Sequence, residues 1–225
     1  MTTSETSSAT IGVLFGGGLD SGILLWERLA AGSIVQPFYV RSGLAWEGAE
    51  LAAAQAFVAA IEHPRLQPLV VLDLPLDDLY AGTWSVTGRE VPNYESTDEA
   101  VFLPARNALL LIKPIVWCQL HGIGRLELAT LASNPFPDAT ESFFREFAHS
   151  LALGVGSPID VVCPYAGLHK REVMLRGAAA PLELTFSCLA PVGSLHCGAC
   201  NKCAERRYAF ASVGRVDLTR YATAQ

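Results

Sequence analysis

Short apolar runs alternate with amphipathic stretches along the first third of the chain. Apolar residues fill positions 11–15, 34–40 and 69–74, as is typical of buried strands. Between them, residues 21–32 and 46–61 place apolar side chains at helical spacing. Because two parallel strands need a crossover connection, this order predicts a parallel sheet with helices on both faces.

The alternation continues through the second half of the chain. Further strands are predicted at residues 126–130 and 160–163. Further helices are predicted at residues 106–121 with a kink at Pro114, at 139–153 with Phe143, Phe147 and Leu151 on one side, at 169–176 and at 204–210. Residues 75–96 keep no period, and we expect them to form an irregular lid over the edge of the sheet.

These elements predict an α/β fold, a Rossmann-like parallel sheet with a small C-terminal appendage. A chain of 225 residues that is 51% hydrophobic can bury one substantial core. We expect residues 1–180 to form the α/β domain, with residues 1–10, rich in Ser and Thr, as a disordered tail. Residues 181–225 are expected to form the appendage.

Charge and hydropathy exclude several classes of function. The net charge of −6 argues against a free nucleic acid as partner, because such binding depends on Lys and Arg neutralising phosphates. No apolar run is long enough to span a membrane, and the first residues lack the basic region of a signal peptide. We therefore expect a soluble cytoplasmic protein.

A glycine-rich loop follows the first predicted strand. The run Gly16-Gly17-Gly18-Leu19-Asp20-Ser21 lies between a strand and a helix, where backbone N–H groups and the positive end of the helix dipole can hold a phosphate. Asp20 next to a phosphate suggests magnesium or a hydrogen bond that fixes the loop. A plain glycine-rich turn explains the same residues without a nucleotide. The Lys of a Walker A loop and the glycine spacing of a dinucleotide fold are both absent.

Four of the six cysteines crowd into sixteen residues near the C-terminus. Cys188, Cys197, Cys200 and Cys203 provide four thiolates at spacings that can close around one tetrahedral ion. Structural zinc is the favoured interpretation, and an iron–sulfur cluster is its main rival. The other two cysteines, Cys118 and Cys163, lie in apolar segments and are predicted to be core thiols.

The glycine loop resembles the Ser-Gly-Gly-x-Asp-Ser pyrophosphatase loop of ATP-dependent adenylating enzymes. Together with the four cysteines, it is similar to the 7-cyano-7-deazaguanine synthases of the queuosine pathway. Four further segments resemble motifs of that family in order along the chain: Phe102-Leu-Pro-Ala-Arg-Asn107, Phe136-Pro-Asp138, His169-Lys-Arg-Glu172 and Thr185-Phe-Ser-Cys188. The resemblance runs from about residue 12 to residue 210.

The resemblance implies a fold, an activity and a set of site residues. The fold would be adenine nucleotide alpha-hydrolase-like, with residues 1–180 binding the nucleotide. The activity would convert 7-carboxy-7-deazaguanine and ammonia to the nitrile through an acyl adenylate, using ATP, Mg²⁺ and a structural Zn²⁺, in a homodimer. Asp20, Ser21, Arg106 and Lys170 would be catalytic, and Arg41, Arg106, Asn107 and Asp138 would bind the deazapurine acid. The residues that would bind ATP are Phe15, Gly16, Gly17, Gly18, Leu19, Asp20, Ser21, Gly22, Ile23, Leu24 and Leu25.

Two departures from the family pattern keep other functions open. Gly16 stands where the family usually has Ser, and Arg41 lies where the family carries an Asp-Tyr-Gly-Gln segment. A related enzyme that amidates or couples a different carboxylate, on a small molecule or a macromolecule, therefore remains an alternative. A zinc protein that binds ATP without turning it over is a second alternative.

Overall fold

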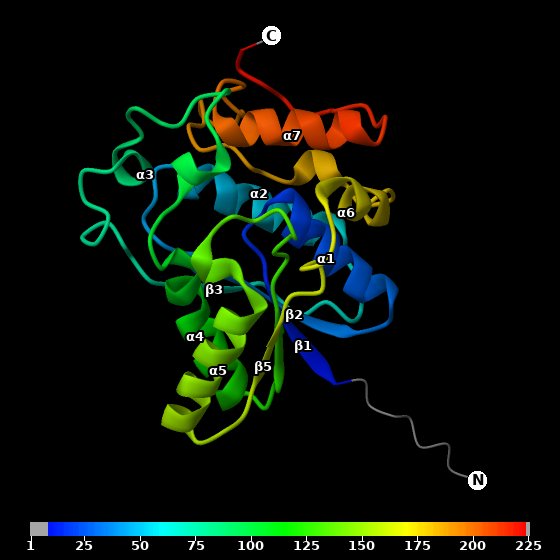
Figure 1. Cartoon of the computed structure of the whole chain (residues 1–225). Helices are drawn as coiled ribbons and strands as arrows, with labels where there is room; N and C mark the ends of the chain where they lie inside the picture. Colours follow the sequence, from blue (N-terminus) through cyan, green and yellow to red (C-terminus); the bar gives the residue numbers. More distant parts are fainter. Residues whose placement is uncertain (1–8, 224–225) are drawn as a thin grey trace.

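The computed structural model describes residues 9–223 and has a five-stranded parallel sheet at its centre (Figure 1). The strands lie in the order β3-β2-β1-β4-β5. Their bounds are Thr10–Leu14 for β1, Ile34–Arg41 for β2, Val70–Asp73 for β3, Arg125–Glu127 for β4 and Asp160–Val162 for β5. In the sheet, β1 lies between β2 on one side and β4 on the other, so the strand order reverses at β1. In such folds, ligands bind at the carboxyl ends of the strands where the order reverses.

Helices connect the strands and the C-terminal segment. Their bounds are Leu19–Ala30 for α1, Glu47–Ala60 for α2, Trp84–Thr87 for α3, Arg106–Leu120 for α4, Glu141–Val155 for α5, Lys170–Arg176 for α6 and Asn201–Ser212 for α7. Short 3₁₀ turns lie at Asp98–Val101, Pro137–Ala139 and Leu182–Leu184. None of the helices within residues 9–223 is long and apolar enough to cross a membrane.

Each face of the sheet is buried under its own set of helices. On one face, α1 and α2 pack over β1 and β2, and α6 and α7 add Val173 and Phe210 to a cluster that also contains Phe15, Ile23 and Phe57. On the other face, α4 and α5 cover the sheet through Leu111, Ile115 and Phe144 (Figure 1). Because both faces of the sheet are buried, the sequence of β2 is mostly apolar and does not alternate between apolar and polar residues.

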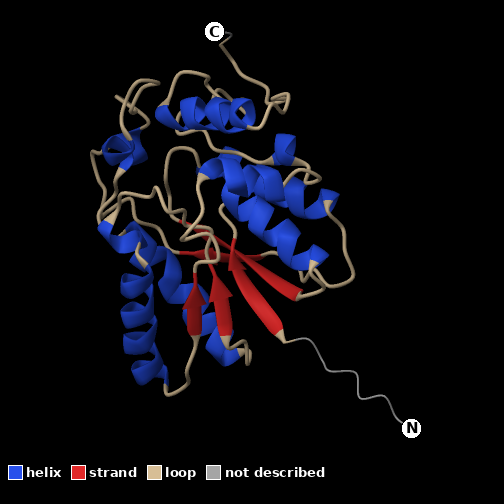
Figure 2. Cartoon of the chain, turned by 45° about the vertical axis from the view of Figure 1, so that its right-hand side comes forward, coloured by secondary structure: helices blue, strands red, loops and turns tan. Residues whose placement is uncertain are grey.

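A third apolar cluster joins the irregular excursion to the C-terminal segment. It brings Leu44, Trp46, Tyr80 and Leu103 against Phe186 and the cysteines. In Figures 1 and 2, α7 lies beyond the carboxyl ends of the strands, above the loops that follow β1 and β4. The C-terminal segment therefore forms part of the roof of the strand ends. The division of domains at residue 180 stays a prediction.

The predicted α/β fold, with its parallel sheet and helices on both faces, is confirmed, and the boundaries differ by a few residues. β4 ends at Glu127 and does not reach Thr130, while α7 begins at Asn201, earlier than predicted. The excursion contains the single-turn helix α3, and α4 runs unbroken through Pro114. The predicted tail is wrong at Thr10, which starts β1, and its residues 1–8 lie outside the described residues.

Candidate active site

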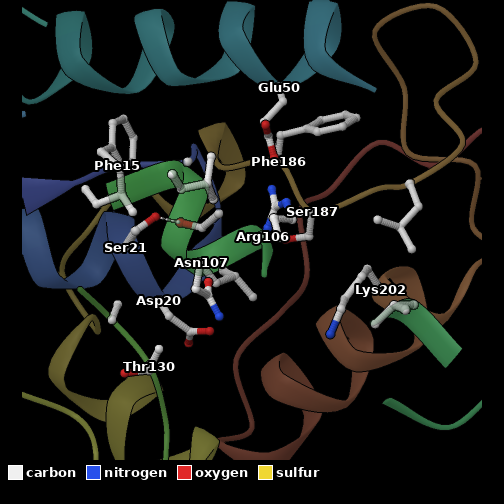
Figure 3. Close-up of a pocket in the computed structure, with 18 of the residues that line it drawn as sticks. Phe15, Asp20, Ser21, Glu50, Arg106, Asn107, Thr130, Phe186, Ser187 and Lys202 are labelled. Carbon is white, nitrogen blue, oxygen red and sulfur yellow. Dashed lines mark hydrogen bonds between the residues drawn. The ribbon is translucent and has the colours of Figure 1, made fainter. Parts of the chain in front are cut away.

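A cavity of about 360 Å³ opens at the carboxyl ends of β1, β2 and β4 (Figure 3). Segments far apart in the sequence line it: the glycine loop with Asp20 and Ser21, the start of α4 with Arg106 and Asn107, and Lys170 at the start of α6. The C-terminal segment closes it with Phe186, Ser187, Lys202, Glu205 and Arg206. Most of the predicted catalytic and substrate-binding residues thus meet in one place.

The glycine loop leaves its backbone donors free for a ligand. Gly18 occupies the N-cap of α1, and no side chain among residues 9–223 caps the first turn. The leading N–H groups of the helix are therefore available to a ligand at the cavity. Gly17 has a φ of 74°, and a Cβ there would lie 3.1 Å from the carbonyl oxygen of Glu50. Gly16 is different, because a Cβ at that position meets nothing within 4 Å. The loop is therefore shaped to hold an anion against backbone N–H groups.

Asp20 and Lys170 form a charged pair beside this loop. The Lys170 ammonium lies 2.6 Å from Oδ2 of Asp20 and 2.8 Å from Oε1 of Glu205. Burial would lower the pKa of Lys170, but the two carboxylates outweigh it and raise that pKa above its ordinary value. Burial likewise opposes the ionised form of Glu205, whose pKa Lys170 and Lys202 nonetheless hold at about 2. The lysine is thus a fixed positive charge next to the loop.

The second oxygen of Asp20 has no partner. Oδ1 is buried and accepts no hydrogen bond among the described residues, and burial raises the pKa of this carboxyl. A buried carboxylate oxygen without a donor is costly unless a ligand or cation completes it. This oxygen is consistent with a magnesium ion carried in with nucleotide phosphates.

Arg106 enters the cavity from the first residue of α4. The preceding residue, Ala105, has a left-handed backbone with a φ of 61°, a strained conformation of the kind found at functional sites. Asp138 fixes the next residue, since its two oxygens accept hydrogen bonds from the backbone N–H of Asn107 at 2.9 Å and from its amide at 3.2 Å. Nε of Arg106 is buried without an acceptor among residues 9–223. The backbone beside Arg106 is therefore held in place, and its guanidinium keeps a donor for a ligand.

Several predicted site residues, Gly17 among them, fall outside the cavity lining. Asp138 is buried behind Asn107 and does not line the cavity. Arg41 is half exposed and makes ion pairs with Glu47 and Asp73, away from the cavity. In α1, residues 22–25 are buried in the core beneath the loop and line nothing, whereas Phe15 and Leu19 do reach the cavity. The assignment of these residues to ligand binding stays a prediction.

The sequence prediction missed several residues that line the cavity. Glu50 on α2 presents a carboxylate to it, and Oε2 accepts a hydrogen bond of 2.8 Å from the Tyr39 hydroxyl. Burial raises the pKa of Glu50 to about 7, against the opposing influence of Arg106. Trp46 and Trp84 stack with their ring centres 5.7 Å apart at the rim. The sequence offers only a weak signal for Glu50, because Glu47 is a second acidic residue in the same Ala-rich helix.

The four C-terminal cysteines form a closed metal-binding set. Their sulfur atoms all lie within 4.8 Å of one another, and three pairs are 3.5, 3.9 and 4.0 Å apart. A tetrahedral ion with metal–sulfur bonds of about 2.3 Å sets its ligands about 3.8 Å apart, so one ion fits. Backbone N–H groups of Ala190, Cys197 and Gly198 donate to these sulfurs, as is typical of thiolates. Cys118 and Cys163 are buried in the core, as predicted. Burial raises the pKa of both thiols.

Comparison with known proteins identifies relatives over nearly the whole chain. A protein from Syntrophobacter fumaroxidans named 7-cyano-7-deazaguanine synthase is 30% identical, over 93% of this chain and 94% of its own length. One of the same name from Koribacter versatilis is 29% identical over 75% of each chain. Among solved structures, a 4-thiouridine synthetase in complex with RNA and ATP aligns with a TM-score of 0.46 and 15% identity, over 92% of this chain and 50% of that one. The family model described as "Queuosine biosynthesis protein QueC" matches residues 10–214, and the chain therefore belongs to this family.

Proposed function

We propose that this protein is an ATP-dependent ligase that converts 7-carboxy-7-deazaguanine and ammonia to 7-cyano-7-deazaguanine, or preQ₀. The observation that carries the proposal is the shared cavity, in which an uncapped glycine loop with Asp20 and Lys170 faces Arg106. The family membership supports the choice of acid. Arg41, which favoured a different substrate, lies outside the cavity lining.

The proposed reaction balances in two rounds of activation. A carboxylate oxygen of the acid attacks the α-phosphate of ATP, which releases pyrophosphate and gives an acyl adenylate. Ammonia adds to the acyl carbon, and AMP leaves with that oxygen to give the amide. The amide oxygen then attacks a second ATP, and loss of AMP and a proton leaves the nitrile. Each round transfers one oxygen of the acid to AMP.

The residues of the cavity would position these groups and stabilise charge. Backbone N–H groups at the start of α1 would hold the departing pyrophosphate, and Lys170 would offset negative charge that develops on it. Asp20 Oδ1 would hold magnesium, which supplies charge neutralisation of the phosphates when bound. Zinc on the four cysteines would be structural, because all four ligand positions are filled by protein.

The proposal extends to the setting of the reaction. Free ammonia would be the nitrogen donor, and the enzyme would act in the cytoplasm as a homodimer. Free nucleic acid would not be a substrate, in keeping with the net charge of −6.

Turnover tests the proposal directly. Purified protein is incubated with the acid, ATP, Mg²⁺ and ammonium, and AMP, pyrophosphate and the nitrile are quantified by chromatography and mass spectrometry. We expect two AMP for each nitrile. Asp20→Asn should abolish product, while Asp78→Asn, a control at an exposed position outside the cavity, should not. AMP formation that does not depend on this acid would refute the substrate assignment but not adenylation.

A further inference from the structure

No residue of this cavity has yet been assigned as the hydrogen-bond acceptor for the N–H groups of the purine-like ring. A guanine-like ring presents two parallel N–H donors on one edge, next to a carbonyl acceptor, and enzymes read such an edge with hydrogen bonds and stacking. Asp138 is not free for this purpose, because Asn107 occupies both of its oxygens and it does not line the cavity. Another carboxylate must therefore be found among the lining residues.

Glu50 is the lining carboxylate that remains available. Asp20 and Glu205, the other two carboxylates of the lining, are both paired with Lys170. Glu50 accepts a hydrogen bond from the Tyr39 hydroxyl on Oε2, and the Trp46 side chain also favours its ionised form. A carboxylate has about four acceptor sites, so two donors still leave lone pairs for a ligand. Glu50, Phe186 and Arg106 all line the cavity, and Figure 3 draws the three in the same part of the view. These groups lie away from Asp20 and Ser21 of the phosphate-binding loop in the same view.

Arg106 provides the complementary donor next to this acceptor. The charges of Arg106 and Glu50 influence each other, yet no ion pair joins them among residues 9–223. Nε of Arg106 also lacks an acceptor in that part of the chain. A donor beside an acceptor matches the carbonyl and the adjacent N–H groups of a guanine-like edge. An adenine edge offers only one N–H group next to a ring acceptor, so it would satisfy one oxygen of the carboxylate.

We propose that Glu50, oriented by Tyr39, binds the two N–H donors of the deazaguanine ring while Arg106 donates to its carbonyl, with Phe186 against the ring. Glu50 would then be the specificity-determining residue for a 2-amino-4-oxo pyrimidine ring. This inference rests on the proposed function for its substrate. It assigns to Glu50 the role that the sequence pattern suggested for Asp138.

Equilibrium binding by calorimetry, without ATP, tests the inference independently of turnover. Glu50→Gln places an amide donor against a ring N–H, so the dissociation constant for the acid should rise roughly 10- to 100-fold. The affinity for ATP should change by less than about twofold. Glu62→Gln, an exposed glutamate just beyond α2, is the matched control and should leave both constants unchanged.

Binding of an acid that lacks the exocyclic amino group shows whether Glu50 recognises the ring or only supports the structure of the cavity. Wild-type protein should bind 7-carboxy-7-deazahypoxanthine roughly tenfold more weakly than the guanine-like acid, and Glu50→Gln should bind the two alike. If Glu50→Gln fails to fold, Tyr39→Phe removes the orienting hydroxyl with the ring retained and should narrow the same difference. The inference would be overturned if the folded variants still bound the guanine-like acid tighter than the hypoxanthine-like acid by the wild-type factor. It would also be overturned if they lost as much affinity for ATP as for the acid.

The two proposals fail in different ways. Wild-type protein that binds the acid with the expected discrimination but releases no AMP would contradict the proposed reaction and support Glu50. AMP and nitrile formation with unchanged discrimination in Glu50→Gln would support the reaction and refute Glu50. Wild-type protein that does not bind the acid would overturn the inference together with the substrate.

Discussion

Adjacent glycines in the phosphate-binding loop have opposite structural requirements. Gly16 has open space where a Cβ would be, so Gly16→Ser should fold and should restore the hydroxyl that related loops carry. One added hydrogen bond to a phosphate should lower the KM for ATP roughly 2- to 10-fold. Gly17 has a positive φ and lies against the backbone of α2, so Gly17→Ala should raise that KM or prevent folding.

Steady-state kinetics and thermal melting of the two variants check this contrast. A Gly16→Ser enzyme with a higher KM for ATP would mean that nucleotide phosphates do not approach this face of the loop. An unaffected Gly17→Ala enzyme would mean that the loop rearranges when it binds a ligand.

Glu50 predicts a pH dependence of acid binding. Its pKa lies near 7 because burial opposes the charge, although Arg106 and the Tyr39 hydroxyl favour it; Glu47 adds to the rise. Protonation removes an acceptor, so affinity for the acid should fall as pH drops through about 7 and towards 5. The Glu50→Gln variant should show no such fall. Calorimetric titrations at several pH values without ATP provide the measurement, and the same fall in the variant would assign it to another group.

Residue roles that depend on distant partners were the part that sequence could not predict. Asp138 looked free to bind a ligand, but its oxygens are used by Asn107, 31 positions earlier. Glu50 was hidden because α2 is rich in Ala and buries only Ala54 and Phe57, so its periodicity did not show which side faces the cavity. Lys170 and Asp20 were predicted, since each belongs to a contiguous motif, and they do meet.

At the scale of elements, α7 is attached to the core by a buried arginine. Arg206 is 1% exposed and donates to the hydroxyls of Thr185 and Thr219 and to the carbonyl of Leu182. Its neighbours in the sequence make a basic helix, and that pattern alone did not show that acceptors from distant positions, Ser187 included, surround Arg206. Arg206→Met should lower the free energy of unfolding by about 2–4 kcal/mol, because buried acceptors lose their donor.

Urea unfolding compares this variant with a surface counterpart. Arg145→Met changes an arginine whose side chain is 69% exposed and should alter stability by less than about 0.5 kcal/mol. Equal effects of the two substitutions would contradict the structural role of Arg206.

Metal binding by the four cysteines should stabilise the whole C-terminal segment. Because Cys188, Cys200 and Cys203 also pack in the third apolar cluster, loss of the ion should loosen the roof of the cavity. We expect one zinc per chain by elemental analysis, and a lower melting temperature after treatment with a strong chelator. Iron and acid-labile sulfide in place of zinc would support the rival cluster.

At the scale of the whole molecule, the order of elements was predictable because strands buried on both faces and helical crossovers leave distinct patterns. The sheet was predicted from five apolar runs, and all five strands are present. The boundaries of β4 and α7 were not predictable. Leu128 stays buried although β4 ends at Glu127, and α7 begins directly after Cys200, a residue of the cysteine cluster. The central consequence is that one cavity brings the glycine loop, Asp20 and Lys170 together with Arg106 and Glu50.

An oxygen-labelling experiment tests the proposed reaction most directly, because it shows where the two carboxylate oxygens of the acid go. The acid is prepared with ¹⁸O in both carboxylate positions and turned over with unlabelled ATP, Mg²⁺ and ammonium, and the AMP is analysed by mass spectrometry. Attack of each oxygen on an α-phosphate predicts one ¹⁸O in every AMP and none in pyrophosphate. AMP without label, with the ¹⁸O released to water or to phosphate, would contradict the account.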